Sequence, residues 1–128
     1  MKKSSILIIM FFAVLGLVVG TAVTQAADSM TGTWKAKVDH PMVKGIQTFV
    51  LQQDGEKITG TWQGGGASKE TEVTGKIQGS DFELTFTHNM IFTYKGKVEG
   101  NKISGLVTMA YPHAKKNPEQ GSFIGKKQ

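Results

Sequence analysis

The sequence predicts an all-β domain, folded as a closed, eight-stranded, antiparallel up-and-down barrel that follows a signal-peptide helix. Apolar and polar residues alternate in segment after segment beyond residue 27, which is the period of half-buried strands. Short turns separate these segments at the regular spacing of sandwiches and barrels. Glycines stand on the apolar face of four segments, where a small barrel must coil sharply. An open β-sandwich of the same strands is the alternative.

The first 27 residues have the pattern of an export signal. Two lysines precede an apolar run over 6–19, and small residues follow, with Thr24 and Ala26 placed as the residues before a cleavage site. An uncleaved membrane anchor is the alternative, because the apolar character continues to about the ~18 residues that a span needs. We therefore expect a signal peptide over 1–27 and a barrel domain over 28–128. The protein would be exported to the bacterial periplasm or the medium and would meet the membrane only through the signal.

The strands are expected, in chain order, from the alternating segments. The first carries Trp34, Ala36 and Val38 on one face, with lysine or aspartate between them. The second and the last segments alternate less cleanly than the others. Mid-segment glycines either ease the bend of the strand or leave room for a ligand, and they are Gly60, Gly75, Gly96 and Gly105. The eight segments are 34–39, 45–53, 58–62, 73–77, 82–87, 92–99, 103–109 and 121–128.

The connections between these segments are of two kinds. "QDGEK", "QGSDF" and "EGNKI" are tight polar turns of the hairpin type. Three of the remaining four connections are longer, and these four hold the three prolines and the three histidines. An up-and-down order brings alternate connections to the same end of a barrel. One end therefore carries the longer, chemically richer loops, which is where binding residues usually lie.

Composition excludes some partners. All 15 basic residues are lysine, and arginine, the usual fork for phosphate, is absent. We therefore expect no specific nucleic-acid binding. Without the two lysines of the signal the formal charge falls from +5 to +3. Cysteine is also absent, so burial and sheet closure must supply the stability that disulfides give many small exported domains.

Four short motifs resemble the avidin and streptavidin family of calycin-like barrels. They are "TGTW" (31–34), "DGEKITGTW" (54–62), "EVTGKI" (72–77) and the small-residue loop "GGGAS" (64–68). The resemblance implies a lipocalin- or avidin-like barrel whose loop between the third and fourth strands covers a ligand. It does not imply biotin as the ligand. The tyrosine that the family places in its "TGTY" motif is Trp62 here, and "KAKVDHP" replaces the serine and asparagine expected after "GTW".

The inward aromatic residues and the loop histidines form the candidate ligand site. An eight-stranded barrel is either filled by side chains or wide enough for one small ligand. We expect a non-catalytic barrel that binds a small, largely apolar molecule at its open end. A cavity of roughly 300 Å³ or more would favour this function, whereas a filled barrel would favour a protein-interaction module such as a hydrolase inhibitor. The candidate residues are Trp34, Trp62, Phe86, Tyr94, His40, His88 and His113.

Each histidine also lies close to a methionine in the sequence. Imidazole and thioether groups together suit the soft ions Cu(I) and Ag(I), so a copper site at the rim is the alternative to a barrel without a cofactor. Solvated histidines beside core-capping methionines would give the same pattern. The metal candidates are His40, Met42, His88, Met90 and His113.

The sequence gives little support for an enzyme. It holds no cysteine, and no serine stands in a nucleophile-elbow motif. The glycine-rich stretch at 63–68 lacks the lysine and the strand–loop–helix context of a phosphate loop. Asp81 and Glu83 fall in a turn and on an outward strand position, where carboxylates are solvated.

Overall fold

The computed structural model describes residues 29–43, 45–65, 69–113 and 117–128. The signal segment predicted over 1–27 lies outside these ranges. Within them, every regular element is a β-strand. No helix in these ranges has the length and apolar character needed to span a membrane.

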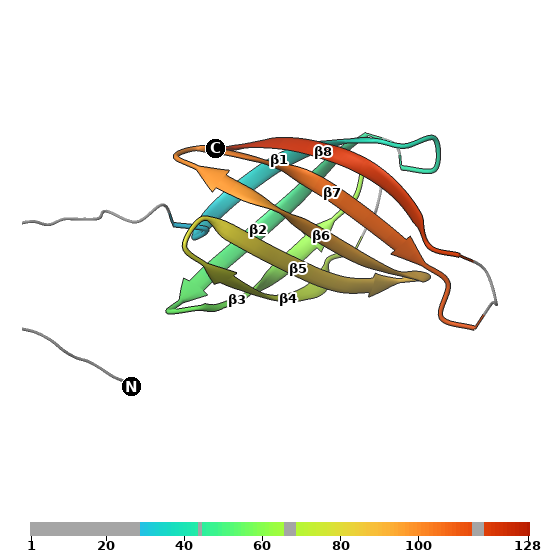
Figure 1. Ribbon diagram of the computed structural model, residues 1–128, viewed down its shortest axis with the longest axis horizontal. Coiled ribbons are helices and arrows are strands. Elements are labelled where there is room, and N and C mark those ends of the chain that lie inside the picture. The colour runs from blue at the N-terminus through green and yellow to red at the C-terminus, as the bar shows by residue number, and fades with distance from the viewer. Residues whose placement is uncertain (1–28, 44, 66–68, 114–116) are drawn as a thin grey trace, which may run out of the picture.

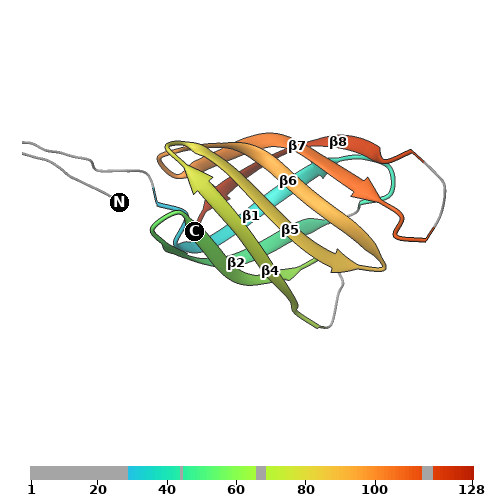
Figure 2. The ribbon, with the colours of Figure 1, turned by 60° about the horizontal axis from the view of Figure 1, so that its bottom comes forward.

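Eight strands close into one barrel, in which each strand pairs antiparallel with its neighbour in the chain and β8 pairs with β1. This order confirms the predicted up-and-down barrel over the open sandwich. Figures 1 and 2 show the strands running obliquely around the long axis of the molecule, as barrel closure requires. The strands are β1 (Gly32–Asp39), β2 (Ile46–Asp54), β3 (Lys57–Gln63), β4 (Thr71–Gln78), β5 (Asp81–His88), β6 (Met90–Glu99), β7 (Lys102–Ala110) and β8 (Glu119–Lys127).

The core is built by alternate residues of every strand. In β5, for example, Phe82, Leu84 and Phe86 are buried and the intervening residues are not. The buried apolar side chains form a single cluster, which Met30 joins from just before β1. No cysteine is available for a disulfide, so this burial and the closed hydrogen-bonded sheet stabilise the domain.

The inward glycines allow neighbouring strands to approach closely. Gly96 and Gly105 are register partners on β6 and β7. A Cβ at Gly96 would lie 2.0 Å from the carbonyl oxygen of Ser104, and one at Gly105 would lie 2.1 Å from that of Lys95. The same crowding against a neighbouring strand affects Gly60 and Gly75. Backbone fills the space beside these glycines, which favours their role in strand coiling over a role in making room for a ligand.

The two ends of the barrel differ as the sequence predicts. The β2–β3, β4–β5 and β6–β7 turns share one end, here called the hairpin end, where Gly55, Gly79 and Gly100 adopt φ angles of 65°, 62° and 62°. The other connections meet at the open end, on the right of Figure 1. Of these, the β5–β6 connection is a tight turn in which Asn89 has a φ of 64°.

Candidate functional site

Three aromatic rings stack inside the open end of the barrel. Trp62 lies next to the end of β3, Phe86 near the end of β5, and Phe92 near the start of β6. The ring centroids of Trp62 and Phe86 are 4.5 Å apart with an interplanar angle of 21°, and those of Phe86 and Phe92 are 5.0 Å apart at 14°. Such offset stacks are a favourable geometry for aromatic pairs. We call these three residues the mouth cluster.

His88 lies beside the mouth cluster at the end of β5. Its ring centroid is 5.1 Å from that of Trp62, and the two planes are tilted by 56°. The imidazole is exposed, whereas the indole is buried. A flat molecule arriving at the mouth would therefore meet both an accessible imidazole and the edge of an apolar stack.

Gln47 is the buried polar residue of this region, with 2% of its surface exposed. Its Oε1 accepts a hydrogen bond of 2.9 Å from Trp62 Nε1, and its Nε2 donates to the carbonyl oxygen of Gly45 at 3.4 Å. The amide therefore fixes the orientation of the indole. The sequence reasoning missed Gln47, although it occupies a core-facing position two residues before Phe49 in β2.

Gly64 brings the start of the β3–β4 connection against the same indole. A Cβ at this position would lie 2.6 Å from Cζ2 of Trp62 and 3.2 Å from Oε1 of Gln47. A larger residue could not pass this close to the ring. The glycine-rich loop singled out in the sequence thus begins in contact with the mouth cluster, and its residues 66–68 lie outside the described ranges.

Below the mouth, further aromatic rings fill the interior. Phe49 and Tyr94 meet edge to face with centroids 5.1 Å apart, and Tyr94 lies 5.0 Å from Phe123. Phe123 in turn lies 6.1 Å from Phe82, near the hairpin end. Larger hollows formed by the described residues, of about 350 to 590 Å³, lie on the outer wall of the barrel. These ring contacts and the single buried cluster show that side chains of the described residues occupy the interior.

Tyr94 carries a polar group into this packed interior. The residue is 1% exposed, and the described residues offer its hydroxyl no hydrogen-bond partner. Burial raises the pKa of Tyr94 far above its ordinary value, because the phenolate would lose its hydration. Tyr94 thus stays protonated throughout the physiological range.

A second group of polar contacts joins the β1–β2 and β7–β8 connections at the open end. Nε2 of His40 lies 3.2 Å from Oε1 of Glu119, and its Nδ1 accepts a hydrogen bond from the backbone N–H of Met42. The hydroxyl of Tyr111 donates to Oε2 of Glu119 at 2.8 Å and lies 3.7 Å from Sδ of Met42. These contacts hold two of the long connections together across the rim.

The other predicted ligand residues are divided between the two ends. Trp34 lies at the hairpin end, where its Nε1 donates to the carbonyl oxygen of Met30 and the Nζ of Lys127 stands 5.2 Å from the ring. Trp62, Phe86 and His88 meet at the mouth, with Tyr94 one ring below. His113 is exposed in the β7–β8 connection. Trp34 and Trp62 share the inner face of the sheet but occupy opposite ends of it.

The predicted metal residues are distributed along the rim. His40 uses both ring nitrogens in the contacts described above, Met42 is exposed, and Met90 is partly buried against the core. Within the described ranges, no three His, Cys, Asp or Glu residues come together as a metal site. A Cu(I) or Ag(I) site through histidine and methionine stays a prediction from the sequence.

Comparison with known proteins identifies the fold. The sequence matches no family model and no curated protein. The structure is similar to apo shwanavidin in two crystal forms, with TM-scores of 0.61 and 0.64, and 14% of residues identical in each case. It is also similar to a shwanavidin variant in complex with biotin, with a TM-score of 0.60 and 17% identity. These alignments cover 80% or 81% of this chain and 99% or 100% of the other. The domain therefore has an avidin-like barrel fold.

Proposed function

We propose that the domain binds a small, largely apolar molecule at its open end, where the edge of the buried mouth cluster supplies an apolar contact and His88 an accessible polar group. One observation carries the proposal: a stack of three rings, oriented by the buried amide of Gln47, lies at the end that bears the longer loops. A protein of similar fold forms a complex with biotin, which supports a ligand-binding role for this barrel.

The packed interior limits where such a ligand would lie. Rings of Phe49, Tyr94 and Phe123 occupy the space below the mouth cluster. The ligand would therefore lie against the mouth rather than deep inside the barrel, in contact with the edge of the mouth cluster, and an aromatic group can meet ring edges in a favourable edge-to-face geometry. Biotin is not expected to bind, because the family's tyrosine position holds Trp62, whose Nε1 already donates to Gln47.

A neutral aromatic probe, N-phenyl-1-naphthylamine, tests the proposal by nuclear magnetic resonance. The chain has two tryptophans, so a ¹⁵N-labelled sample gives two indole N–H signals, assigned with a Trp34→Phe variant. We expect the probe to shift the signal of Trp62 and to leave that of Trp34 unchanged. Equal shifts of both signals, or a shift of Trp34 alone, would place the probe elsewhere and refute the site.

A matched pair of variants measures the contribution of the mouth cluster. Phe92→Leu removes a ring of the cluster, whereas Phe82→Leu makes the same change near the hairpin end. Since an aromatic contact contributes about 0.5–1.5 kcal/mol beyond its area, the first change should weaken probe binding by roughly two- to tenfold. The second should leave the affinity unchanged. Biotin at the same concentration should not displace the probe.

Side chains in the interior favour a second function over a ligand held deep in the barrel, namely a protein-interaction barrel that uses its loops at the open end. Met42 is exposed on the β1–β2 connection beside Tyr111, so an apolar side chain of a partner has a contact there.

Export by the signal over 1–27 forms part of either function. The intact mass of the protein from its native source tests cleavage of this signal. A cleaved protein lacks the mass of residues 1–27, whereas a protein with an uncleaved anchor retains it.

A further inference from the structure

A second surface, separate from the mouth, lies on the outer wall of the barrel over β1, β8 and β7. It is a groove of about 590 Å³ with Gly125 in its lining. Ile46 and Ile124 are 39% and 65% exposed and both line the groove. We call it the basic groove, and its lining comprises Lys35, Lys37, Ile46, Glu99, Lys102, Ile103, Ser104, Ile124, Gly125, Lys126 and Gln128.

Strand register places like charges side by side in the basic groove. Lys35 of β1 is opposite Lys126 of β8, and Lys126 is opposite Lys102 of β7, whose partner on its other side is Glu99 of β6. Lys37 stands between the two isoleucines, opposite Ile46 on one side and Ile124 on the other. Like charges directly opposite in a sheet destabilise it. The arrangement therefore has a cost that negative charge on a bound molecule would relieve.

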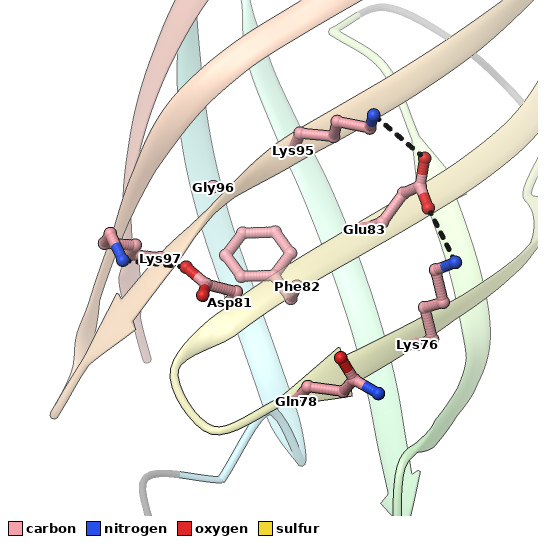
Figure 3. A pocket seen from close by; sticks show the side chains of 8 residues that line it. All are labelled: Lys76, Gln78, Asp81, Phe82, Glu83, Lys95, Gly96 and Lys97. Carbon is pink, nitrogen blue, oxygen red and sulfur yellow. Dashed lines mark hydrogen bonds and ion pairs between the residues drawn. The ribbon is translucent and has the colours of Figure 1, made fainter.

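A hollow on the other side of the barrel shows how lysines are neutralised elsewhere in this protein. There Glu83 pairs with both Lys76 and Lys95, at 3.5 and 3.8 Å (Figure 3). In the same hollow, Lys97 pairs with Asp81 at 2.8 Å. In the basic groove, by contrast, none of the four lysines forms an ion pair with a described residue, although Glu99 lies beside Lys102, and Lys35 donates a hydrogen bond of 3.5 Å to the hydroxyl of Thr48.

We infer that the basic groove is a docking site for an acidic segment of a partner protein that also carries apolar side chains. Carboxylates of the partner would pair with Lys35 and Lys126, and its apolar side chains would cover Ile46 and Ile124. A second copy of this chain that docked through the same face would bring the same lysines together and is disfavoured. A concave groove fits a projecting segment better than a flat bilayer. Because the barrel is closed, the partner segment cannot add a strand to a sheet edge. The side chains of the groove would therefore recognise it.

The test is a titration of the full domain with a synthetic peptide of alternating glutamate and leucine, followed by the backbone amide signals of a ¹⁵N-labelled sample. We expect shifts centred on Lys37, Ile124 and Lys126, which decrease as salt is added. The same peptide with lysine in place of glutamate should cause none. The peptide is expected to bind away from the mouth, so the indole N–H signal of Trp62 should not shift.

Two double variants with equal loss of charge localise the effect. Lys35→Gln with Lys126→Gln changes the basic groove, and Lys76→Gln with Lys95→Gln changes the hollow of Figure 3, where both side chains are highly exposed. The first pair should weaken binding about fivefold and the second less than twofold, as expected for exposed ion pairs. Equal effects, no binding of the acidic peptide, or binding only to anionic phosphatidylglycerol vesicles would overturn the inference. Because the mouth cluster is unchanged in all variants, the small-molecule proposal stands or fails separately.

Discussion

At the scale of single residues, Gln47 and Tyr94 carry the polar chemistry of the interior. Gln47 is satisfied by the indole of Trp62 and the backbone of Gly45, so it orients the mouth cluster at little cost in desolvation. Tyr94 differs, because the described residues do not bond its hydroxyl. A buried hydroxyl without a partner costs stability, and this makes Tyr94 a sensitive reporter of the packed interior.

Replacing Tyr94 by phenylalanine should make stability less dependent on alkaline pH. The pKa of Tyr94 is raised in the folded state, so its contribution is complete below its ordinary value of 10.0 and is lost as the pH rises through the folded value. Between pH 8 and pH 11 the wild type should therefore lose more stability than Tyr94→Phe. The expected difference is about 1.4 kcal/mol, because pH 11 lies one unit above the pKa of tyrosine in the unfolded chain.

Urea unfolding at the two pH values measures this difference. At pH 8 the variant should be at least as stable as the wild type, because it removes a buried hydroxyl and keeps the ring contacts with Phe49 and Phe123. Parallel loss of stability in both proteins above pH 10 would show that the hydroxyl is hydrated in the folded state.

At the scale of strands, the paired glycines Gly96 and Gly105 allow β6 and β7 to approach closely. A Cβ at Gly96 would overlap the carbonyl oxygen of Ser104, and backbone atoms of a paired strand cannot move aside. Gly96→Ala should therefore cost at least about 3 kcal/mol, at the upper end of overpacking effects. Thermal or urea unfolding of the variant measures this cost.

Gly100 provides the control for that substitution. It has a φ of 62° in the β6–β7 turn, and nothing lies within 4 Å of an added Cβ. Gly100→Ala should therefore cost only the left-handed backbone penalty, about 1–2 kcal/mol. If the two variants were equally stable, close approach between strands would not be the reason for glycine at Gly96.

Strand positions were predictable from the sequence because alternation reports which side of a sheet each residue faces. The second strand was the least regular, since Ile46 and Val50 are apolar on the outside and Gln47 is polar on the inside. That same irregularity coincides with two features on which the proposals rest, the basic groove and the support of Trp62 by Gln47. Gln47 could have been recognised from the sequence, because it is a polar residue at a position of β2 that faces the core.

Position along the barrel axis was not predictable in the same way. Trp34 and Trp62 face the same side, and Phe49 is the register partner of both. The inclination of the strands nevertheless carries Trp34 to the hairpin end and Trp62 to the mouth. Alternation contains no information about this inclination, which depends on register. Likewise, chain order indicates which loops share an end but not how far apart His40, His88 and His113 lie.

At the scale of the whole molecule, an avidin-like barrel with a packed interior offers two separate surfaces. The mouth is aromatic and is oriented by a buried amide. The basic groove is on the outer wall and combines lysines with exposed isoleucines. The lining of the basic groove contains no residue of the mouth cluster, so the small-molecule and protein-partner proposals can be tested separately.

Native mass spectrometry of the protein purified from its own source, without denaturation, tests the central claim most directly. If the mouth binds a small apolar molecule, the wild type should carry one additional mass of a small organic compound. The Phe82→Leu variant should retain this mass, and the Phe92→Leu variant should lose most of it. A wild type with no added mass, or an added mass that both variants retain equally, would contradict binding at the mouth cluster.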